Sequence, residues 1–210
     1  VPLACPNVLQ IVEVIDRDPA RRFDRLREIL NKYHEPFRKS RVMLFVREKL
    51  KAFDLENLLI DAGYDNVQCV HAGKTQRERL KALRRFRTAP KGFLVASDVA
   101  GRGLDIPEVS MVINFMFPKH IEDYVHRIGR TGRAGAKGLA YTFIGDEDRH
   151  MVGKLKRVLL QSGAYVPDSL LKMVRAQGDV YSKMLTEEQG FDPAIAMLTE
   201  HHVGPGQKRR

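Results

Sequence analysis

The segment from His126 to Arg133, HRIGRTGR, holds the side chains best suited to chemistry in this chain. It carries one histidine and three arginines, while Gly129 and Gly132 leave room for a ligand to approach the backbone closely. Arginine keeps its charge and pairs bidentately with phosphate oxygens, so this composition suits a polyphosphate. If the segment stays helical, Arg130 and Arg133 share one face and can reach one anion together. From these residues alone, a solvated basic helix end is an equal alternative.

The composition narrows the class of protein and of partner. A chain of 210 residues fits one large domain, or one domain with an appendage, and can bury a proper core. The net charge of +10 and a pI near 9.7 indicate an anionic partner, with nucleic acid the first candidate. The sequence has no membrane-length apolar run, and its first residues lack the pattern of a signal peptide. We therefore expect a soluble monomer inside the cell, in the nucleus, the cytoplasm or both.

The elements that must position these residues alternate between strand-like and helix-like patterns. Helices are expected from Pro19 with Asp18 as N-cap, over Lys49–Ala62, and from a Thr75–Glu78 capping box toward Ala89. Apolar runs of strand length surround them at Leu9–Ile15, Val42–Val46, Val67–Val70, Phe93–Ala96, Val109–Phe115 and Leu139–Ile144. Short connections between such elements predict parallel strands with right-handed crossovers. The expected fold class is α/β, a three-layer domain with a mostly parallel sheet flanked by helices.

Four unusual polar segments follow strands of this predicted sheet. They are Arg47, His71 to Gln76, Ser97 to Asp105, and the stretch from Phe115 that leads into HRIGRTGR. Ligands of open parallel sheets bind where the loops after the strands meet. We therefore expect all four segments to lie at the carboxyl edge of the sheet and to share one site.

The helix after His71 is strongly basic, with eight Lys or Arg and one acid between His71 and Lys91. Most of this charge is expected to be a solvated face. A helical wheel places Gln76 and Arg79 on the arc of Leu80, Leu83 and Phe86. Polar side chains in the first turn of a core-facing arc need partners, so we interpret both as contacts to a nucleic-acid backbone.

The glycine-rich segment from Ala96 to Pro107 offers a second set of phosphate and ribose contacts. The Ser97 hydroxyl and free backbone amides suit a phosphodiester. Asp105 suits either ribose hydroxyls or an arginine such as Arg102. Taken alone, the segment favours a glycine-rich loop with an internal salt bridge over a phosphate or ribose site.

Together these motifs resemble the C-terminal RecA-like domain of a DEAD-box RNA helicase, in helicase superfamily 2. The resemblance covers about Leu9 to Ile144, and the motifs stand in family order. FVREK at Phe45–Lys49 resembles motif IV, HAGKTQRER at His71–Arg79 motif IVa, ASDVAGRGLD at Ala96–Asp105 motif V, and EDYVHRIGRTGR at Glu122–Arg133 motifs Va and VI.

The resemblance implies a role for each matching residue. Arg130 and Arg133 would be arginine fingers on the γ-phosphate of ATP, and so the catalytic residues. Other ATP-site residues would be Asp105 near the ribose, Arg102, and the pair His126 and Arg127 linking the site to a partner domain. RNA phosphates would be held by Gly73, Gln76, Arg79, Ser97 and Gly101. No metal ligand is expected in this chain.

The chain also departs from the family pattern. Glu48 stands where motif IV usually has threonine, and its carboxylate would repel an RNA phosphate; Arg47 or Lys49 would have to substitute. The usual His-Gly-Asp becomes His71-Ala72-Gly73, which removes the aspartate. Ser97 replaces a common threonine but retains the hydroxyl.

The parts that hold ATP in a phosphoryl-transfer site are missing from this sequence. Gly73-Lys74-Thr75 imitates the end of a phosphate-binding loop, but Gln68 stands where that loop requires glycine. Asp146-Glu147-Asp148 imitates a magnesium-binding strand end, and we interpret it as the acidic start of a helix. ATP and Mg²⁺ would thus be held by an N-terminal RecA-like domain of the same protein, and the chain alone would be inactive.

Four parts of the chain are expected. Residues 1–8 would be a linker from the N-terminal domain, 9–163 the RecA-like domain, 164–203 a helical extension that could recruit protein partners, and 204–210 a disordered basic tail. The expected function is that of an ATP-dependent RNA helicase that unwinds short duplexes or remodels RNA–protein complexes. A non-catalytic RNA-binding or protein-docking module with this fold, and a DNA translocase, stay open as alternatives.

Overall fold

The computed structural model describes residues 6–98 and 103–189, with side chains up to residue 179. Its centre is a six-stranded sheet in the order β1-β6-β5-β2-β4-β3. Every neighbouring pair is parallel. The strands are β1 (Val8–Val14), β2 (Ser40–Val46), β3 (Val67–Val70), β4 (Lys91–Ser97), β5 (Met111–Asn114) and β6 (Gly138–Ile144). The predicted fold class is confirmed, and each predicted strand is present with bounds shifted by at most two residues.

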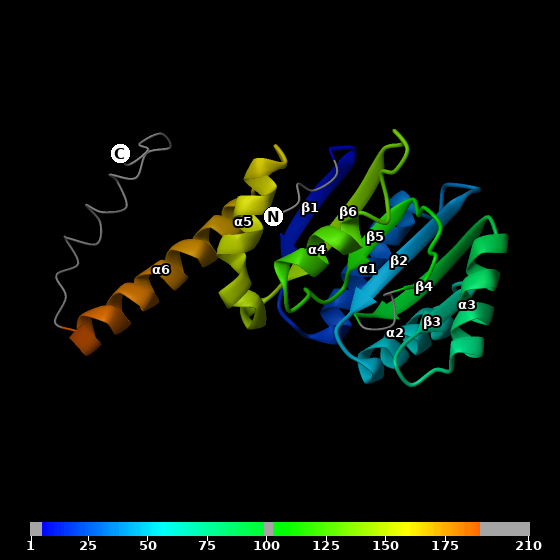
Figure 1. Cartoon of the computed structure of the whole chain (residues 1–210), viewed down its shortest axis with the longest axis horizontal. Helices are drawn as coiled ribbons and strands as arrows, with labels where there is room; N and C mark the ends of the chain where they lie inside the picture. Colours follow the sequence, from blue (N-terminus) through cyan, green and yellow to red (C-terminus); the bar gives the residue numbers. More distant parts are fainter. Residues whose placement is uncertain (1–5, 99–102, 190–210) are drawn as a thin grey trace.

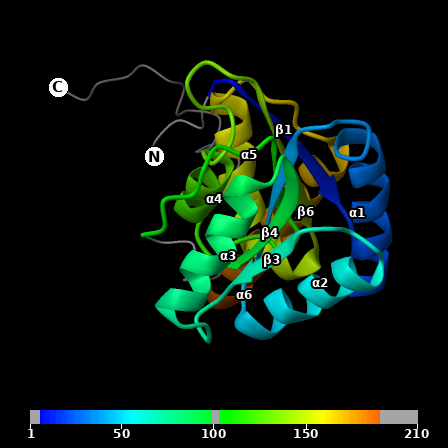
Figure 2. The same cartoon turned by 90° about the vertical axis from the view of Figure 1, so that its right-hand side faces the viewer.

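Helices cover both faces of this sheet. α1 (Pro19–Tyr33) and α2 (Lys49–Asp61) lie on one face, and α3 (Gln76–Thr88) and α4 (Ile121–Ile128) lie on the other (Figures 1 and 2). After β6, a short 3₁₀ turn η1 (Asp146–Met151) leads into α5 (Val152–Gln161), which packs on the α4 side. The domain is therefore the three-layer arrangement that the alternating pattern predicts.

The predicted helix starts are confirmed in atomic detail. The Asp18 side chain accepts a hydrogen bond from the Ala20 amide at 3.1 Å, and Pro19 occupies the first helical position. At α3, the Glu78 amide donates to Thr75 Oγ1 at 3.2 Å and the Thr75 amide donates back to Glu78 Oε2 at 2.7 Å. Both caps satisfy amides that a helix start would otherwise leave unpaired, and so both anchor the loops that precede them.

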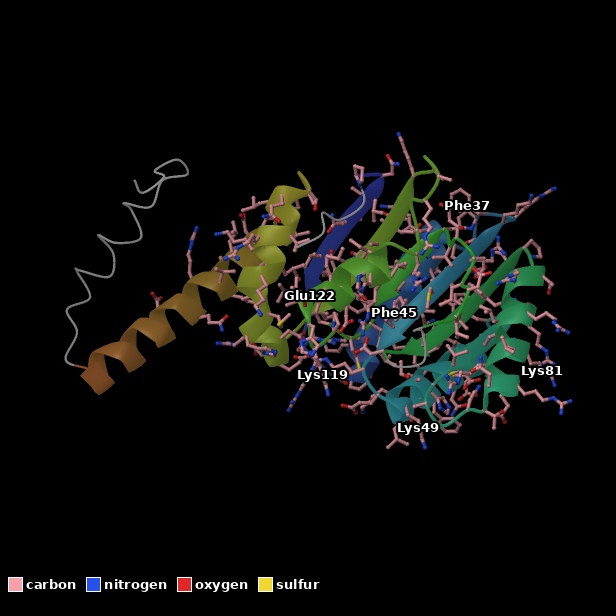
Figure 3. All side chains as sticks on the ribbon, in the orientation of Figure 1. Phe37, Phe45, Lys49, Lys81, Lys119 and Glu122 are labelled. Atoms are coloured by element: carbon pink, nitrogen blue, oxygen red, sulfur yellow. The ribbon has the colours of Figure 1, made fainter. Side chains whose placement is uncertain are left out.

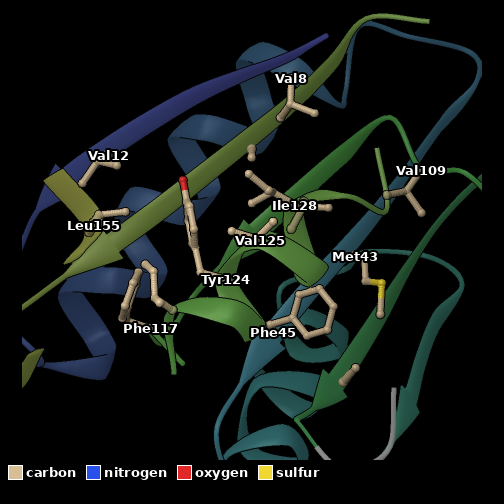
Figure 4. Close-up of a cluster of buried hydrophobic side chains, with 14 of the residues drawn as sticks. Val8, Val12, Met43, Phe45, Val109, Phe117, Tyr124, Val125, Ile128 and Leu155 are labelled. Carbon is tan, nitrogen blue, oxygen red and sulfur yellow. The ribbon is translucent and has the colours of Figure 1, made fainter. Parts of the chain in front are cut away.

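Two separate hydrophobic clusters fill the space between the layers. One joins α1 and α2 to the sheet, with Leu26, Leu55 and Phe93 among its buried members. The other joins α3, α4 and α5 to the opposite face; Figure 4 shows Tyr124, Val125 and Ile128 of α4 packed over the strands. Tyr124 also donates from its hydroxyl to Gln10 Oε1 at 2.8 Å, which ties α4 to β1. α4 is thus held firmly where it crosses the sheet.

The C-terminal helix α6 (Asp168–Gln189) begins inside this core. Leu170 is fully buried in the α4-side cluster, and Met173 and Val174 pack against it. Beyond these turns α6 runs away from the sheet (Figure 1). The end of the predicted extension, residues 190–203, and the predicted tail over 204–210 lie outside the described residues. Among those described, no helix is both long and apolar enough to cross a bilayer.

Candidate functional site

The arginine loop, defined here as residues 129–133, follows the last turn of α4 and is not helical. The condition under which Arg130 and Arg133 would share a helix face, that the segment stays helical, is therefore not met. α4 ends at Ile128 with Gly129 as its C-cap, and Gly132 adopts a left-handed φ of +69°, which turns the chain away from the helix axis. The two arginines are instead brought together by a tight turn.

Hydrogen bonds to Glu108, Val109 and Ser110 fasten this loop to the residues before β5. The Val109 amide donates to the Arg130 carbonyl at 3.1 Å, and Thr131 Oγ1 donates to the Val109 carbonyl at 2.6 Å. The Arg133 amide donates to Glu108 Oε1 at 3.0 Å. A loop so tied to a strand start holds its arginines in a fixed position.

These bonds also show that the loop lies at the amino edge of the sheet. A Cβ on Gly132 would stand 2.7 Å from Val8 Cγ2, at the start of β1. The expected single site at the carboxyl edge is thus wrong in part. The reason is α4, which starts after the carboxyl end of β5 and carries the chain back about 12 Å, at 1.5 Å per residue.

The Arg130 side chain reaches across the face of the sheet. It lines a cavity of about 90 Å³ together with Met43, Asp98 and His126. Burial, and secondarily the neighbouring charge of Arg133, lowers the pKa of Arg130. In the described part of the chain no carboxylate pairs with Arg130. An anion that binds Arg130 would offset both effects, while the carboxylates of Asp98 and Asp123, which also line this cavity, limit the anion to the side of the two arginines.

Arg133 is exposed and only partly engaged. Its Nε donates to the Gly129 carbonyl at 2.6 Å, which leaves the terminal guanidinium nitrogens open to solvent. Two guanidiniums within mutual electrostatic reach, one half-buried and one exposed, form a cradle for a polyanion.

Arg127 lies beneath this cradle, with 4% of its surface exposed. Its Nε donates to Asp98 Oδ1 at 3.0 Å, and its Nη1 donates to Asn114 Oδ1 at 3.1 Å and to the Met116 carbonyl at 2.9 Å. Its Cζ lies 4.9 Å from the centre of the Phe45 ring. Burial lowers the pKa of Arg127, and Asp98 opposes that shift. The structure thus places this predicted ATP-site residue inside the domain, where it positions α4 against β2, β4 and β5.

The two other predicted ATP-site residues that the structure describes both lie at the surface. His126 is exposed on α4, and Asp105 is exposed near the end of α3, where Arg87 donates to its carbonyl. Arg102, and Gly101 of the RNA-binding set, lie outside the described residues.

The predicted RNA-binding residues gather separately, at the carboxyl edge. The Gly73 amide donates to His71 Nδ1 at 3.0 Å, and a Cβ at Gly73 would stand 2.8 Å from Lys49 Cδ and 3.0 Å from Lys49 Nζ. The Lys49 side chain, from the start of α2, therefore lies directly against Gly73, and a larger residue here would displace it. Burial, and then Lys74 and Lys49, lower the pKa of His71. Figure 3 shows that Lys49, at the start of α2, and Lys81, on α3, both project outward.

Arg79 braces the same loop. Its Nε donates to the Lys74 carbonyl at 3.1 Å while Lys74 Nζ donates to the Cys69 carbonyl at 2.8 Å. Gln76 is exposed beside it. The helical wheel predicted Leu80 on the core-facing arc of this helix, and that prediction is wrong, because Leu80 is 51% exposed. The buried face of α3 consists of Ala82, Leu83 and Phe86.

Ser97 and Arg47 differ from their predicted accessibility. Ser97, at the end of β4, is only 3% exposed. Arg47 cannot replace the missing motif IV threonine, because its Nε donates to the Phe117 carbonyl and its Nη2 pairs with Asp148 at 2.6 Å. Lys49, exposed beside Gly73, is the available substitute.

The sequence did not predict two ion pairs that lie at the carboxyl edge of the sheet. Arg22 of α1, 2% exposed, pairs with Glu147 Oε1 at 2.8 Å, and Arg47 pairs with Asp148. The acidic triplet does begin a helical turn, as predicted, but two of its carboxylates also bind distant arginines. One pattern in the sequence could have indicated the first pair: Arg22 stands beside Phe23 and Leu26 on the apolar face of a helix, where a buried arginine needs a carboxylate partner.

Comparison with known proteins decides the family. The family model "Helicase conserved C-terminal domain" matches residues 21–135. The chain belongs to the helicase C-terminal domain family. This domain is 42% identical to DEAD-box ATP-dependent RNA helicase 5 of Oryza sativa subsp. japonica over 197 residues, which are 92% of this chain and 38% of that protein.

Solved structures agree with this assignment. The yeast DEAD-box splicing factor Prp28 superposes with a TM-score of 0.72 at 32% identity, covering 81% of this chain and 37% of that one. The E. coli DEAD-box protein SrmB, solved bound to regulator of ribonuclease activity A, gives 0.63 at 34% identity, covering 78% and 93%. The resemblance to a DEAD-box C-terminal domain is confirmed. The domain spans little more than a third of the rice relative that it matches.

Proposed function

We propose that this domain supplies one half of a composite ATPase site and one half of an RNA-binding surface in an ATP-dependent RNA helicase. The observation that carries this proposal is the cradle of Arg130 and Arg133, whose guanidiniums form no ion pair with a carboxylate in the described residues. Burial, and secondarily the charge of Arg133, lowers the pKa of Arg130. Because the chain has no phosphate-binding loop of its own, the phosphates must come from a facing RecA-like domain.

The donor set fits ATP. Arg130 and Arg133 would bind the γ-phosphate oxygens and stabilise the charge that develops during phosphoryl transfer. Asp105, exposed nearby, would accept from the ribose hydroxyls, and His126 would contact the facing domain. Arg127 would hold α4, and hence the arginine loop, in a fixed position against the sheet. ATP supplies the hydrolysable phosphoanhydride bond, and the facing domain would hold Mg²⁺.

RNA would bind at the carboxyl edge through its backbone. Gly73, Gln76 and Arg79 lie there with Lys49, and Gly101 belongs to the same predicted set. Ser97 ends β4 at this edge, but it is buried and offers little surface to a phosphate. Lysine, arginine and backbone amides contact phosphates rather than base edges, so binding would be independent of base sequence. Separation of the RNA cluster from the arginine cradle lets ATP-driven closure of two domains act on a bound strand.

The relatives' names support this proposal: those compared include an ATP-dependent RNA helicase and a splicing factor of the DEAD-box type. They disfavour the alternative of a non-catalytic module. We infer a monomer that unwinds short duplexes or remodels RNA–protein complexes, and whose extension beyond residue 164 contacts protein partners.

RNA-stimulated ATP hydrolysis tests the composite site. The domain alone should neither hydrolyse ATP nor bind single-stranded RNA tightly, and the protein that joins it to its facing RecA-like domain should do both. Turnover by the isolated domain would refute the half-site proposal.

A further inference from the structure

A basic groove lies at the amino edge of the sheet, at the opposite end of the strands from the predicted RNA-binding residues. It has a volume of about 550 Å³ and is formed by residues at the starts of β2, β4, β5 and β6. Its charged side chains are four cations and one acid: Lys39, Arg41, Arg87, Lys137 and Glu108. The acid, Glu108, already accepts a hydrogen bond from the Arg133 amide at 3.0 Å. None of the predicted ATP or RNA contacts that the structure describes lines this groove.

The cations of the basic groove keep most of their donors free. Lys39 and Lys137 are exposed and form no ion pair with a described residue. Arg41 engages only its Nη1, which donates to the Arg87 carbonyl at 2.9 Å. Arg87 pairs loosely with the exposed Asp105, at 3.5 Å. Within the described part of the chain, three of the four cations therefore lack a carboxylate partner, and such an excess of positive charge attracts a polyanion.

An exposed aromatic ring stands beside these cations. Phe37 lies two residues before Lys39, on the loop between α1 and β2, and 55% of its surface is exposed. The loop fixes the ring, because the Phe37 amide donates to the His34 carbonyl at 3.1 Å and the buried His34 Nδ1 lies 2.7 Å from Ser40 Oγ. Figure 3 shows Phe37 and Lys49 at the two ends of β2. A basic groove next to an exposed aromatic ring is the combination that binds single-stranded nucleic acids, through phosphate contacts and base stacking.

We propose that the basic groove is a second binding site for single-stranded RNA, which holds a part of the substrate outside the strand bound at the carboxyl edge. Lys39, Arg41 and Lys137 contact the phosphates, and Phe37 stacks on one base. The exposed ring favours RNA over an acidic protein segment, whose carboxylates would use only the cations. The inference rests on the proposed function, because it takes RNA as the substrate.

The position of the basic groove determines which RNAs it serves. The seven residues of β2 separate the two edges of the sheet by roughly 20 Å. Only a long strand therefore reaches both sites. Because the groove lies within one domain, its contribution to RNA affinity does not depend on the closure of two domains over ATP.

Equilibrium titrations of the protein that joins this domain to its facing RecA-like domain test the second site. Fluorescent single-stranded RNAs of roughly 8 and roughly 40 nucleotides are titrated at several salt concentrations, with and without a non-hydrolysable ATP analogue. The groove variants are Lys39→Ala, Lys137→Ala and Phe37→Ala. Lys154→Ala and Leu160→Ala are their matched controls, at exposed positions of α5 outside the groove. Thermal unfolding establishes that each variant is folded.

The two kinds of groove variant should differ in their response to salt. Each lysine variant should reduce the slope of log K against log salt concentration by about 0.7 for the long RNA, because one phosphate contact is lost. Phe37→Ala should leave that slope unchanged and weaken binding of the long RNA at least about fivefold, because one stacked base is lost. Both effects should be the same with and without the ATP analogue. The short RNA bound with the analogue, and both controls, should change less than twofold.

Three results would overturn the second site: groove variants that bind the long RNA as the wild type does, controls that lose as much affinity, or polyglutamate that binds the groove more tightly than RNA. Arg79→Ala, measured in parallel, separates this inference from the proposed function. A loss in Arg79→Ala alone overturns only the second site. No loss in any variant contradicts RNA binding by the domain altogether.

Discussion

The Arg127 side chain of α4 donates from Nε to Asp98 Oδ1 at 3.0 Å, joining residues 29 positions apart. This pair fastens α4 to the end of β4, and α4 ends one residue before the arginine loop begins. The same guanidinium reaches β5 through Asn114. Arg130 and Arg133 therefore take their position from a buried arginine whose guanidinium is hydrogen-bonded within the domain.

Arg127→Ala should lower the free energy of unfolding by about 3–5 kcal/mol, because breaking a buried pair leaves the Asp98 carboxylate uncompensated. Urea unfolding measures this change. Arg149→Ala removes an exposed pair with Asp146 and should cost less than about 1 kcal/mol. Equal effects of the two substitutions would contradict the positioning role of Arg127.

Gly132→Ala should destabilise the domain more than Gly135→Ala. Both residues have positive φ, +69° and +80°, which costs a non-glycine residue roughly 1–2 kcal/mol. Only at Gly132 does the added Cβ also meet a neighbour, Val8 Cγ2 at 2.7 Å, whereas Gly135 has nothing within 4 Å. Denaturant unfolding of both variants isolates this contact. Identical losses would show that the loop does not pack on β1 as described.

Arg79→Ala should weaken binding of single-stranded RNA by roughly tenfold, about 1.4 kcal/mol. The substitution removes a cation and also the hydrogen bond that braces the Lys74 carbonyl. Arg84→Ala, an exposed arginine of the same helix, should change binding less than about threefold and act mainly through salt dependence. Equilibrium titrations at two salt concentrations compare them, and equal affinities would remove Arg79 from the site.

His34 should make the domain less stable in acid. Burial lowers its pKa from the ordinary 6.5 to about 4, and the Lys91 charge acts in the same direction. The unfolded chain therefore binds the proton first, so stability is full above about pH 6.5 and falls as the pH drops toward 4. His34→Gln should flatten this loss by roughly 3 kcal/mol between pH 7 and pH 4. The same pH profile in both proteins would show that His34 does not titrate in this window.

Local patterns predicted the fold because strands and caps depend on near neighbours. Val67–Val70 was predicted with its observed bounds, and Asp18 and the Thr75–Glu78 box cap their helices as expected. The prediction that Leu80 is buried was wrong, because the helical spacing of apolar residues does not show how much of a helix face the rest of the domain covers.

The site was only half predictable, because its shape depends on where α4 returns the chain. The sequence places Arg130 and Arg133 after a strand but cannot show that an eight-residue helix carries them to the amino edge. Nor does it distinguish a buried arginine such as Arg127, whose partners Asp98 and Asn114 come from other strands, from an exposed one that meets a ligand.

The central claim is that Arg130 and Arg133 act on ATP held by another domain. The direct measurement is kcat for RNA-stimulated ATP hydrolysis by the two-domain protein carrying Arg130→Ala or Arg133→Ala, with RNA affinity measured in parallel. An arginine finger contributes about 10³–10⁵ to kcat, so each variant should lose at least about 100-fold while RNA affinity stays within about threefold. A kcat equal to that of the wild-type protein in either variant would contradict the account.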